Sequence, residues 1–428
     1  IYYRINMNIN DLSTGLKKYG YYKFDNKIFV NKHDVLDYAI LQKNYNPNIE
    51  FIFHDEIYSK IDWKIEPSID LETLYFLRAK QLRDTYDYLI LQYSGGADSH
   101  QVLFTFLKNN IHIDEIQTYY PTSLLDKIDH IKDRTHDLAG MFEYNFTAVP
   151  VLKFIEKKYP KIKINIIDTT NYLKQNLNER FLSDNFKHLR IAHTLLLPMV
   201  NLQSFDVINS FSEKLSGKTI GVIYGADKPF PIIQNNELFF SFHDTGRSGL
   251  EAQTYTKNDN RFVPEMFYWS PELPLIPIKQ MHIINNYLKL KIDKNFYDDI
   301  VSPKYKKFGN YRTYSQNKIE ELIYPFWNKN IFQNVIKGQD DIIFKYLFSE
   351  YSFKTNNLNL RKKSWSNNFV DTLLDIKNLN FIEKYNKFNS SKLFSFKTNK
   401  STNNIYILYS KIESKFYKIS DLDINDSL

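Results

Sequence analysis

One stretch of the chain, residues 88–110 with the sequence YLILQYSGGADSHQVLFTFLKNN, limits the available folds more than any other. It joins a short apolar run, two adjacent glycines between serines, and a second apolar run at helical spacing. A strand that passes through a glycine turn directly into a helix is typical of α/β proteins. The chain has only 12 glycines in 428 residues, so an adjacent pair at this turn indicates that the backbone itself has a conformational or binding role there.

The residues that follow alternate between strand-like and helix-like patterns. The expected strands and helices, in chain order, are residues 88–93, 99–110, 113–121, 124–142, 161–170, 179–202 and 218–229. Strands separated by helices favour a mostly parallel sheet with helices on both faces, in which ligands bind at the carboxyl ends of the strands. We therefore expect an α/β fold that places both glycine turns, at Gly95 with Gly96 and at Gly225, at strand ends.

The chain before this region has a mixed pattern. Residues 49–58 alternate like a strand. Residues 68–87 place leucines at helical spacing after a cap at Ser68 or Asp70. These patterns predict an α+β lead-in over residues 1–84.

The chain after the alternating region is more helical. Residues 236–262 look like a hairpin or a polar excursion, and residues 404–419 look like a terminal strand pair. Helix-like runs lie at residues 271–290, 340–351 and 368–379. We expect a central domain at 85–290 and a basic, mainly helical C-terminal domain at 291–428.

The formal net charge of +7 is concentrated in this last third. Residues 291–428 carry 23 Lys and Arg against 15 Asp and Glu, whereas residues 1–290 carry 33 against 34. A basic surface is typical of contact with an anionic partner such as nucleic acid. The lysines are scattered rather than clustered, which a solvated lysine-rich surface also explains. Both interpretations stay open.

Cysteine is absent from the chain. This absence excludes disulfides, thiolate zinc sites, cysteine-ligated iron–sulfur clusters and a cysteine nucleophile within the chain. The first residues, IYYRINMNIN, lack the order of a secretory signal, and no run of about 18 uncharged apolar residues occurs. We therefore expect a cytoplasmic protein that does not span a membrane.

The hexapeptide SGGADS, residues 94–99, has the composition of an anion-binding turn. Backbone N–H groups at a helix start carry partial positive charge, and glycines let the backbone approach a phosphate closely. Ser94 and Ser99 can donate further hydrogen bonds, and Asp98 suits this setting if it holds Mg²⁺ bound to phosphates. The Gly-Lys-Ser/Thr ending of a Walker A loop is missing. An ordinary glycine turn that caps a helix is the alternative.

The same hexapeptide after an apolar strand resembles the SGGxDS pyrophosphate loop of the N-type ATP pyrophosphatases, the PP-loop superfamily, at every fixed position. The resemblance covers roughly residues 85–290, and the chain is nearest in appearance to the synthetase domain of asparagine synthetase. It implies a sheet of the adenine nucleotide alpha-hydrolase type. It also implies an enzyme that splits ATP between the α and β phosphates, adenylates an acceptor oxygen and releases AMP when a nucleophile attacks.

The resemblance also assigns roles to individual residues. The residues that it implies hold ATP, pyrophosphate and Mg²⁺ at the first turn are Ser94, Gly95, Gly96, Ala97, Asp98 and Ser99. Tyr119 and its neighbours would lie beside the adenine, which backbone groups usually recognise. Asp98 would act in catalysis as well as in metal binding.

The second glycine turn, IYGADKP at residues 223–229, loosely matches the layout of the asparagine synthetase relatives. The resemblance places Gly225 near ATP, implies that Asp227 binds Mg²⁺, and gives Lys228 a catalytic role. In that role Lys228 offsets the charge that builds on the departing pyrophosphate. A turn with a solvated Asp and Lys is the alternative.

Other polar residues are weaker candidates. The cations that could clamp phosphate, or lie on solvated helix faces, are Arg134, Arg180, Lys187 and Arg190. His193 falls in an apolar helical segment and is expected in the core. His243, Asp244 and Arg247 belong to a segment expected as a mobile loop over the substrate or as a surface hairpin.

Three functions remain open from the sequence. Without cysteine, the chain cannot carry persulfide sulfur itself or hold a cysteine-dependent glutaminase site, which favours C–N bond formation with ammonia or an amine from elsewhere. We expect an ATP- and Mg²⁺-dependent, AMP-forming ligase or amidotransferase-like enzyme. The alternatives are a tRNA- or base-modifying enzyme of the same superfamily, docked through its basic C-terminal third, and a non-catalytic nucleotide-binding module. The acceptor is a small molecule or a nucleic acid.

Overall fold

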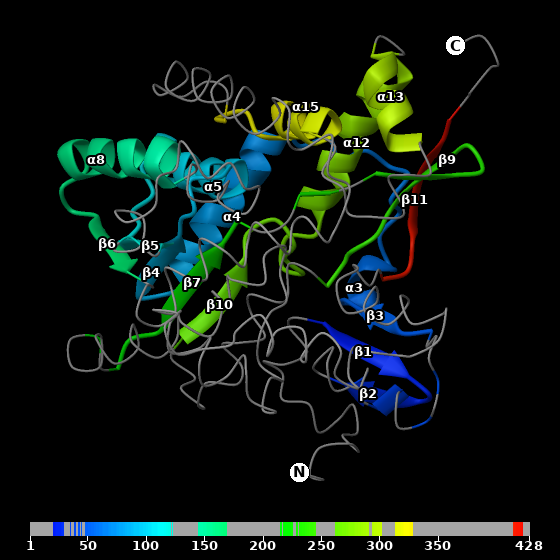
Figure 1. Cartoon of the computed structure of the whole chain (residues 1–428), viewed down its shortest axis with the longest axis horizontal. Coiled ribbons are helices and arrows are strands. Elements are labelled where there is room, and N and C mark those ends of the chain that lie inside the picture. Colours follow the sequence, from blue (N-terminus) through cyan, green and yellow to red (C-terminus); the bar gives the residue numbers. More distant parts are fainter. Residues whose placement is uncertain are drawn as a thin grey trace, which may run out of the picture.

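The structure is a computed structural model of the chain (Figure 1). It describes residues 20–29, 48–120, 144–168, 217–225, 228–229, 231–244, 262–290, 293–301, 313–327 and 414–422, with Val35, Tyr38, Ala39, Gln42, Asn44, Thr122 and Leu215 between them.

A five-stranded, all-parallel sheet forms the centre of the fold. Its strands are β4 (Tyr88–Gln92), β5 (Glu115–Tyr120), β6 (Lys163–Asp168), β7 (Ile220–Tyr224) and β10 (Phe262–Met266). They lie in the order β10-β7-β4-β5-β6. The chain moves outward from β4 to β6 and then returns to the other side of β4 with β7 and β10. The direction of winding therefore changes between β4 and β7, and ligands bind in parallel α/β sheets at the carboxyl ends of such strands.

Three helices pack with this sheet. They are α4 (Leu71–Thr85), α5 (Ala97–Lys108) and α8 (Val149–Lys158), and α4 and α5 also contact each other. The α/β prediction is confirmed by the sheet and these helices. Helices on both faces stay a prediction, because the expected helices at 124–142 and 179–202 lie outside the described residues.

Buried apolar side chains on both faces of β4 explain its continuous apolar sequence. Leu89 and Leu91 belong to the large core cluster that includes side chains of α4 and α5. Ile90 points to the other face, where it packs in a second cluster with Tyr119 and Val222.

The other described strands form two three-stranded antiparallel sheets. One contains β1 (Tyr21–Phe24), β2 (Lys27–Phe29) and β3 (Glu50–Ile52); the other contains β8 (Ile232–Gln234), β9 (Glu237–Phe240) and β11 (Tyr417–Asp421). Figure 1 shows the parallel sheet in one half of the molecule and β1, β3, β9 and β11 in the other.

The structure corrects the expected boundaries of two strands. The strand expected at 49–58 ends at Ile52, because His54 adopts a left-handed backbone with φ of 48° and a short helix, α3 (Asp55–Tyr58), follows. Of the segment 236–262, expected as a hairpin or a polar excursion, residues 237–240 form β9, which pairs with β8 across a turn at Asn235 and Asn236, both with positive φ as tight hairpin turns require. Residues 245–261 lie outside the described residues.

Three described helices follow β10 along the chain. They are α12 (Leu275–Lys289), which confirms the helix expected at 271–290, α13 (Lys294–Val301) and α15 (Thr313–Ile323). The expected helices at 340–351 and 368–379, and the first strand of the terminal pair, lie outside the described residues. The second strand is β11, which pairs with β9. No helix in the described part of the chain is long and apolar enough to cross a membrane.

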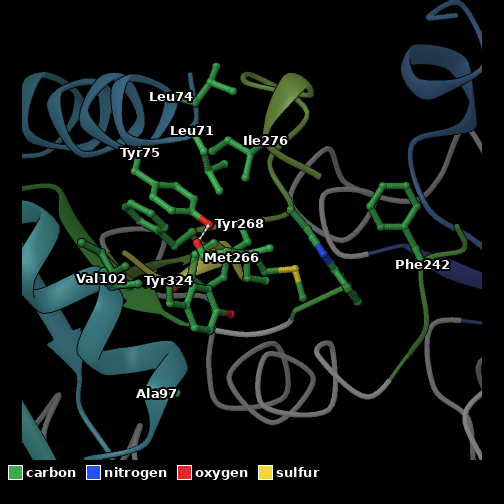
Figure 2. Close-up of a cluster of buried hydrophobic side chains, with 14 of the residues drawn as sticks. Leu71, Leu74, Tyr75, Ala97, Val102, Phe242, Met266, Tyr268, Ile276 and Tyr324 are labelled. Atoms are coloured by element: carbon green, nitrogen blue, oxygen red, sulfur yellow. Dashed lines mark hydrogen bonds between the residues drawn. The ribbon is translucent and has the colours of Figure 1, made fainter. Parts of the chain in front are cut away.

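One buried cluster connects these parts. Figure 2 shows Tyr75 of α4, Tyr268 after β10 and Tyr324 after α15 close together. The ring centroids of Tyr75 and Tyr268 are 5.6 Å apart, and those of Tyr268 and Tyr324 are 5.3 Å apart. The end of α15 is therefore packed into the core beside the glycine loop of α5.

Candidate active site

The glycine pair forms the connection between β4 and α5, as the sequence predicts. Gly95 has φ of 92°, a conformation that glycine adopts far more readily than other residues. A Cβ at Gly95 would also lie only 2.9 Å from the backbone nitrogen of Ala148, at the start of α8. Position 95 therefore requires glycine for two reasons, its conformation and its contact with α8.

The two serines make hydrogen bonds within the loop. The hydroxyl of Ser99 donates to the carbonyl oxygen of Gly96 at 3.1 Å and lies 3.2 Å from the hydroxyl of Ser94. The backbone N–H of Gly96 donates to the Ser94 hydroxyl at 3.1 Å. Ser94 is exposed and Ser99 is buried, so Ser94 is the more accessible to a ligand.

Helix α5 begins without a side-chain cap. Its N-cap residue is Gly96, which has no side chain to accept a hydrogen bond from the first turn. The first N–H groups of a helix have no acceptor within the helix, and they carry the positive end of its dipole. This arrangement suits an anion placed at the loop.

The second glycine turn lies directly against the first. A Cβ at Gly225 would be 2.8 Å from both the carbonyl carbon of Asp98 and the backbone nitrogen of Ser99. Glycine is therefore required at position 225 for the end of β7 to approach the start of α5. This contact brings Lys228 beside Asp98. Asp227, the other expected metal ligand, lies outside the described residues.

Asp98 and Lys228 form the charged centre of the site. The Nζ atom of Lys228 lies 3.0 Å from each carboxylate oxygen of Asp98 and 3.0 Å from Oε1 of Glu320. The side chain of Lys228 is 5% exposed and that of Asp98 is 31% exposed. Lys228 is thus held inside the protein, while Asp98 retains access to solvent. The alternative interpretation, a turn with a solvated lysine, is therefore wrong for Lys228.

Two tyrosines complete the environment of Asp98. Tyr324 donates its hydroxyl to Oδ1 of Asp98 at 2.6 Å, and Tyr268 donates to the backbone oxygen of Asp98 at 2.8 Å. Burial, and then the charge of Asp98, raise the pKa of Tyr324 well above its ordinary value of 10.0. The Tyr324 hydroxyl therefore stays protonated and acts as a donor.

Glu320, Tyr324 and Tyr268 were not among the residues expected from the sequence. Glu320 lies in the last turn of α15 and Tyr324 follows four residues later, a spacing that places both on one side of a helix. No motif in residues 313–327 points to the glycine loop. The four-residue spacing is the one signal that could have suggested a shared role.

Tyr119 lies in β5, and its side chain is buried. Its hydroxyl donates to Oε1 of Gln117 at 2.7 Å. Its main chain pairs with Ile167 of β6. Thr118 is nearer to the loop, because its hydroxyl donates to the carbonyl oxygen of Tyr93 at 2.9 Å. A role for Tyr119 in adenine binding stays a prediction.

The structure describes two of the weaker polar candidates, His243 and Asp244. His243 and Asp244 are buried in the core, where Asp244 accepts a hydrogen bond from Tyr22 at 3.0 Å and the ring of His243 meets Trp269 edge-on. A mobile or surface loop is therefore wrong for these two residues. The remaining candidates lie outside the described residues: Arg134, Arg180, Lys187, Arg190, His193 and Arg247.

The described residues at the loop are compatible with a magnesium ion that a nucleotide helps to hold. The described residues contain no group of three or more His, Cys, Asp or Glu that could hold a metal ion. Mg²⁺ in nucleotide sites usually needs only one or two carboxylates, because phosphates and water supply its other ligands. Asp98 supplies one carboxylate, next to the uncapped start of α5 and the glycines at 95 and 225.

Comparison with known proteins adds no family assignment: no protein-family description matches the chain, and no curated protein matches it.

Proposed function

We propose that this chain is an ATP-dependent ligase of the PP-loop type, which adenylates an acceptor oxygen, releases pyrophosphate and passes the acceptor to ammonia or an amine. One observation carries the proposal. The SGGADS loop lies at the carboxyl end of β4, where the winding of the sheet reverses, and Lys228 from the end of β7 reaches its aspartate. A glycine turn that merely caps a helix would not need the close approach of Gly225 or a buried lysine.

Each group at the site has a task in this proposal. The uncapped amides of α5 and the Ser94 hydroxyl bind phosphate oxygens. Asp98 holds Mg²⁺, which supplies charge neutralisation on the phosphates when bound. Lys228 offsets the negative charge that develops on the departing pyrophosphate. Tyr268 and Tyr324 keep the first turn of α5 in place through their bonds to Asp98.

Formation of a C–N bond is the chemistry that the composition favours. The chain has no cysteine that could carry sulfur as a persulfide, so it cannot transfer sulfur through its own side chains. Ammonia or an amine needs no covalent carrier on the protein. An amide-forming reaction therefore requires fewer additional components than a thiolation.

The test is to follow ATP labelled in its γ phosphate, with Mg²⁺, ammonium and pools of carboxylic acids as acceptors. We expect labelled pyrophosphate and AMP. The Asp98→Asn variant should lower the rate by about 100-fold or more, because it removes charge at the metal position. Asp70→Asn, at the start of α4, is the matched control and should retain the rate. Release of ADP and phosphate would contradict this mechanism. If ATP is not cleaved with any acceptor, the remaining interpretation is a non-catalytic nucleotide-binding module.

A nucleic-acid acceptor is the second candidate, supported by the net charge of +8 carried by residues 291–428. In that case pyrophosphate release should require RNA or DNA, and binding to it should weaken steeply as salt is raised. If small carboxylic acids alone support the release, this candidate is excluded.

A further inference from the structure

The residues that follow α15 lie against the first turns of α5. Tyr324 donates its hydroxyl to Oδ1 of Asp98 at 2.6 Å, and the backbone N–H of Phe326 donates to Oε1 of Gln101 at 3.0 Å. Asp98 and Gln101 are three residues apart in the helix, so they lie on one side of α5. The segment 324–326 therefore bonds to α5 twice, once at the proposed metal ligand and once about a turn further along.

Helix α4 holds the same segment at its other end. The last carbonyl groups of a helix have no donor within it, and Ile323 is the last residue of α15. The hydroxyl of Tyr75, in α4, donates to the carbonyl oxygen of Ile323 at 2.9 Å and accepts from Nε2 of Gln280 at 2.8 Å. The main chain on both sides of Tyr324 is thus fixed by fully buried side chains of other helices.

Gln101 is a polar side chain in the interior of the protein. It is fully buried, and its amide is paired at both ends, through Oε1 to Phe326 and through Nε2 to the Thr105 hydroxyl at 3.3 Å. Burial of an amide costs free energy unless its hydrogen bonds are made, and an apolar side chain of similar size avoids that cost. The proposed function leaves Gln101 without a task.

The bond from Tyr324 to Asp98 is the contact that this arrangement protects. A metal-binding carboxylate holds its metal more tightly when a second hydrogen bond fixes its orientation. The Tyr324 hydroxyl supplies such a bond at Oδ1. A backbone shift of about 1 Å at Tyr324 would take the two oxygens beyond hydrogen-bond distance. The orientation of Asp98 therefore depends on how firmly residues 323–326 are held.

We propose that Gln101 is a positioning residue, whose bond to the Phe326 N–H keeps the Tyr324 hydroxyl on Asp98 and so prepares that carboxylate for a magnesium–nucleotide. This inference rests on the proposed function, because it requires nucleotide and Mg²⁺ at the SGGADS loop. It goes beyond that function by making the orientation of Asp98 depend on a backbone segment more than two hundred residues away.

The test is a double-mutant cycle on binding rather than on turnover. The full chain is titrated calorimetrically, in excess Mg²⁺, with α,β-methylene-ATP, which cannot be split between its α and β phosphates. Tyr324→Phe retains the ring, removes the hydroxyl and should weaken binding by about tenfold. Gln101→Met should weaken binding by at least about threefold in the unchanged protein and have no further effect in Tyr324→Phe, because the bond that it protects is already absent.

Two control variants remove similar groups elsewhere. Tyr287→Phe removes another tyrosine hydroxyl that donates to a carboxylate, that of Asp293 at 2.9 Å, and should leave the affinity unchanged. Asn285→Leu removes a buried amide of α12, whose oxygen accepts from the Ser420 hydroxyl at 2.7 Å. It should lower the stability without changing the affinity, which separates a loss of core packing from a loss of positioning.

A second variant replaces Gln101→Met in the cycle if that protein does not fold. Tyr75→Phe retains the ring and removes the donor to the Ile323 carbonyl oxygen. It should weaken binding in the unchanged protein and have no further effect in Tyr324→Phe, because it loosens the same segment.

The outcomes distinguish this inference from the proposed function. If the unchanged protein does not bind the analogue with Mg²⁺, the proposed function fails. If it binds, but Gln101→Met has no effect or weakens binding equally with and without the Tyr324 hydroxyl, the inference about Gln101 is wrong and the proposed function stands. Unchanged affinity in Tyr324→Phe leads to the same conclusion.

Discussion

Helices α4 and α5 contact each other, yet their N-termini differ in construction. Asp70 caps α4, because its carboxylate accepts from the backbone N–H of Thr73 at 2.8 Å and from the Thr73 hydroxyl at 2.7 Å. Helix α5 follows Gly96, which offers no cap, and the carboxylate of Asp98 in its first turn pairs with Lys228. The start of α4 is capped by its own residues, whereas the start of α5 has no side-chain cap, as the proposed anion site requires.

The buried cations near the two helices differ in the same way. Arg78 of α4 is 1% exposed and donates to Glu265, which is 5% exposed, and to the carbonyl oxygen of Met266. Lys228 pairs with Glu320, which is 9% exposed, and with Asp98, which is 31% exposed. A charge pair with both members buried has no member that a ligand can reach, whereas Asp98 is accessible to a ligand.

The largest expected effect comes from removing one of these cations. Arg78→Met should lower the free energy of unfolding by about 3–5 kcal/mol, because it leaves the Glu265 carboxylate buried without its cation. Lys228→Met also removes a cation from a buried carboxylate, that of Glu320. It should lower the free energy of unfolding by a smaller amount, roughly 1–3 kcal/mol, because the second carboxylate, Asp98, can be solvated and Tyr324 still donates to it. Chemical denaturation of both variants measures the difference. A greater loss for Lys228→Met would make Lys228 a structural cation and remove the contrast.

The capped start of α4 was predictable from local sequence, and the site at the start of α5 was predictable only in part. Asp70 was one of two expected caps, and the loop at Gly95 and the turn at Gly225 fall at strand ends as expected. These features depend on neighbours in the chain. Tyr324 meets Asp98 across more than two hundred residues, and Glu320 meets Lys228 from another distant part of the chain. Such a contact follows from how the elements pack and leaves no local pattern.

Strand β10 shows a different limit. Its sequence FVPEM contains Pro264, which cannot donate a ladder hydrogen bond, and it follows a polar segment. No strand was predicted from the sequence at residues 263–266. Among the described strands, β10 lies at the edge of the sheet beside β7, where a proline is tolerated. The proline is therefore compatible with a strand at this position in the sheet.

A smaller effect is expected at the cap of α4. Asp70→Ala should lower the free energy of unfolding by about 1 kcal/mol, because it leaves the N–H of Thr73 without its acceptor. Hydrogen bonds from Thr73 lower the pKa of Asp70 below its ordinary value of 3.8. The stabilisation by this carboxylate is therefore complete above pH 3.8 and lost as the pH falls through the lower folded value.

The measurement for this cap is thermal unfolding of Asp70→Ala and of the unchanged protein between neutral pH and pH 3. The two curves should approach each other in acid, where the unchanged protein also loses the cap. Binding of α,β-methylene-ATP should be equal in both proteins. A loss of nucleotide binding in Asp70→Ala would show that the start of α4 is not purely structural.

The smallest change in stability, and the sharpest test of the comparison, comes from giving α5 the cap that it lacks. The backbone at Gly96 is extended, with φ of −75° and ψ of 164°, which serine adopts readily. Gly96→Ser should raise the free energy of unfolding by a few tenths of a kcal/mol, because its hydroxyl accepts from the first-turn amides. The same hydroxyl then occupies amides that the phosphates need, so affinity for the nucleotide analogue should fall about tenfold. Asp70→Ser, which replaces one cap by another on α4, should change neither quantity. If Gly96→Ser raises the stability and lowers the affinity, the phosphates bind to the amides that the serine hydroxyl would cap. An unchanged affinity would mean that the phosphates, if bound, lie elsewhere.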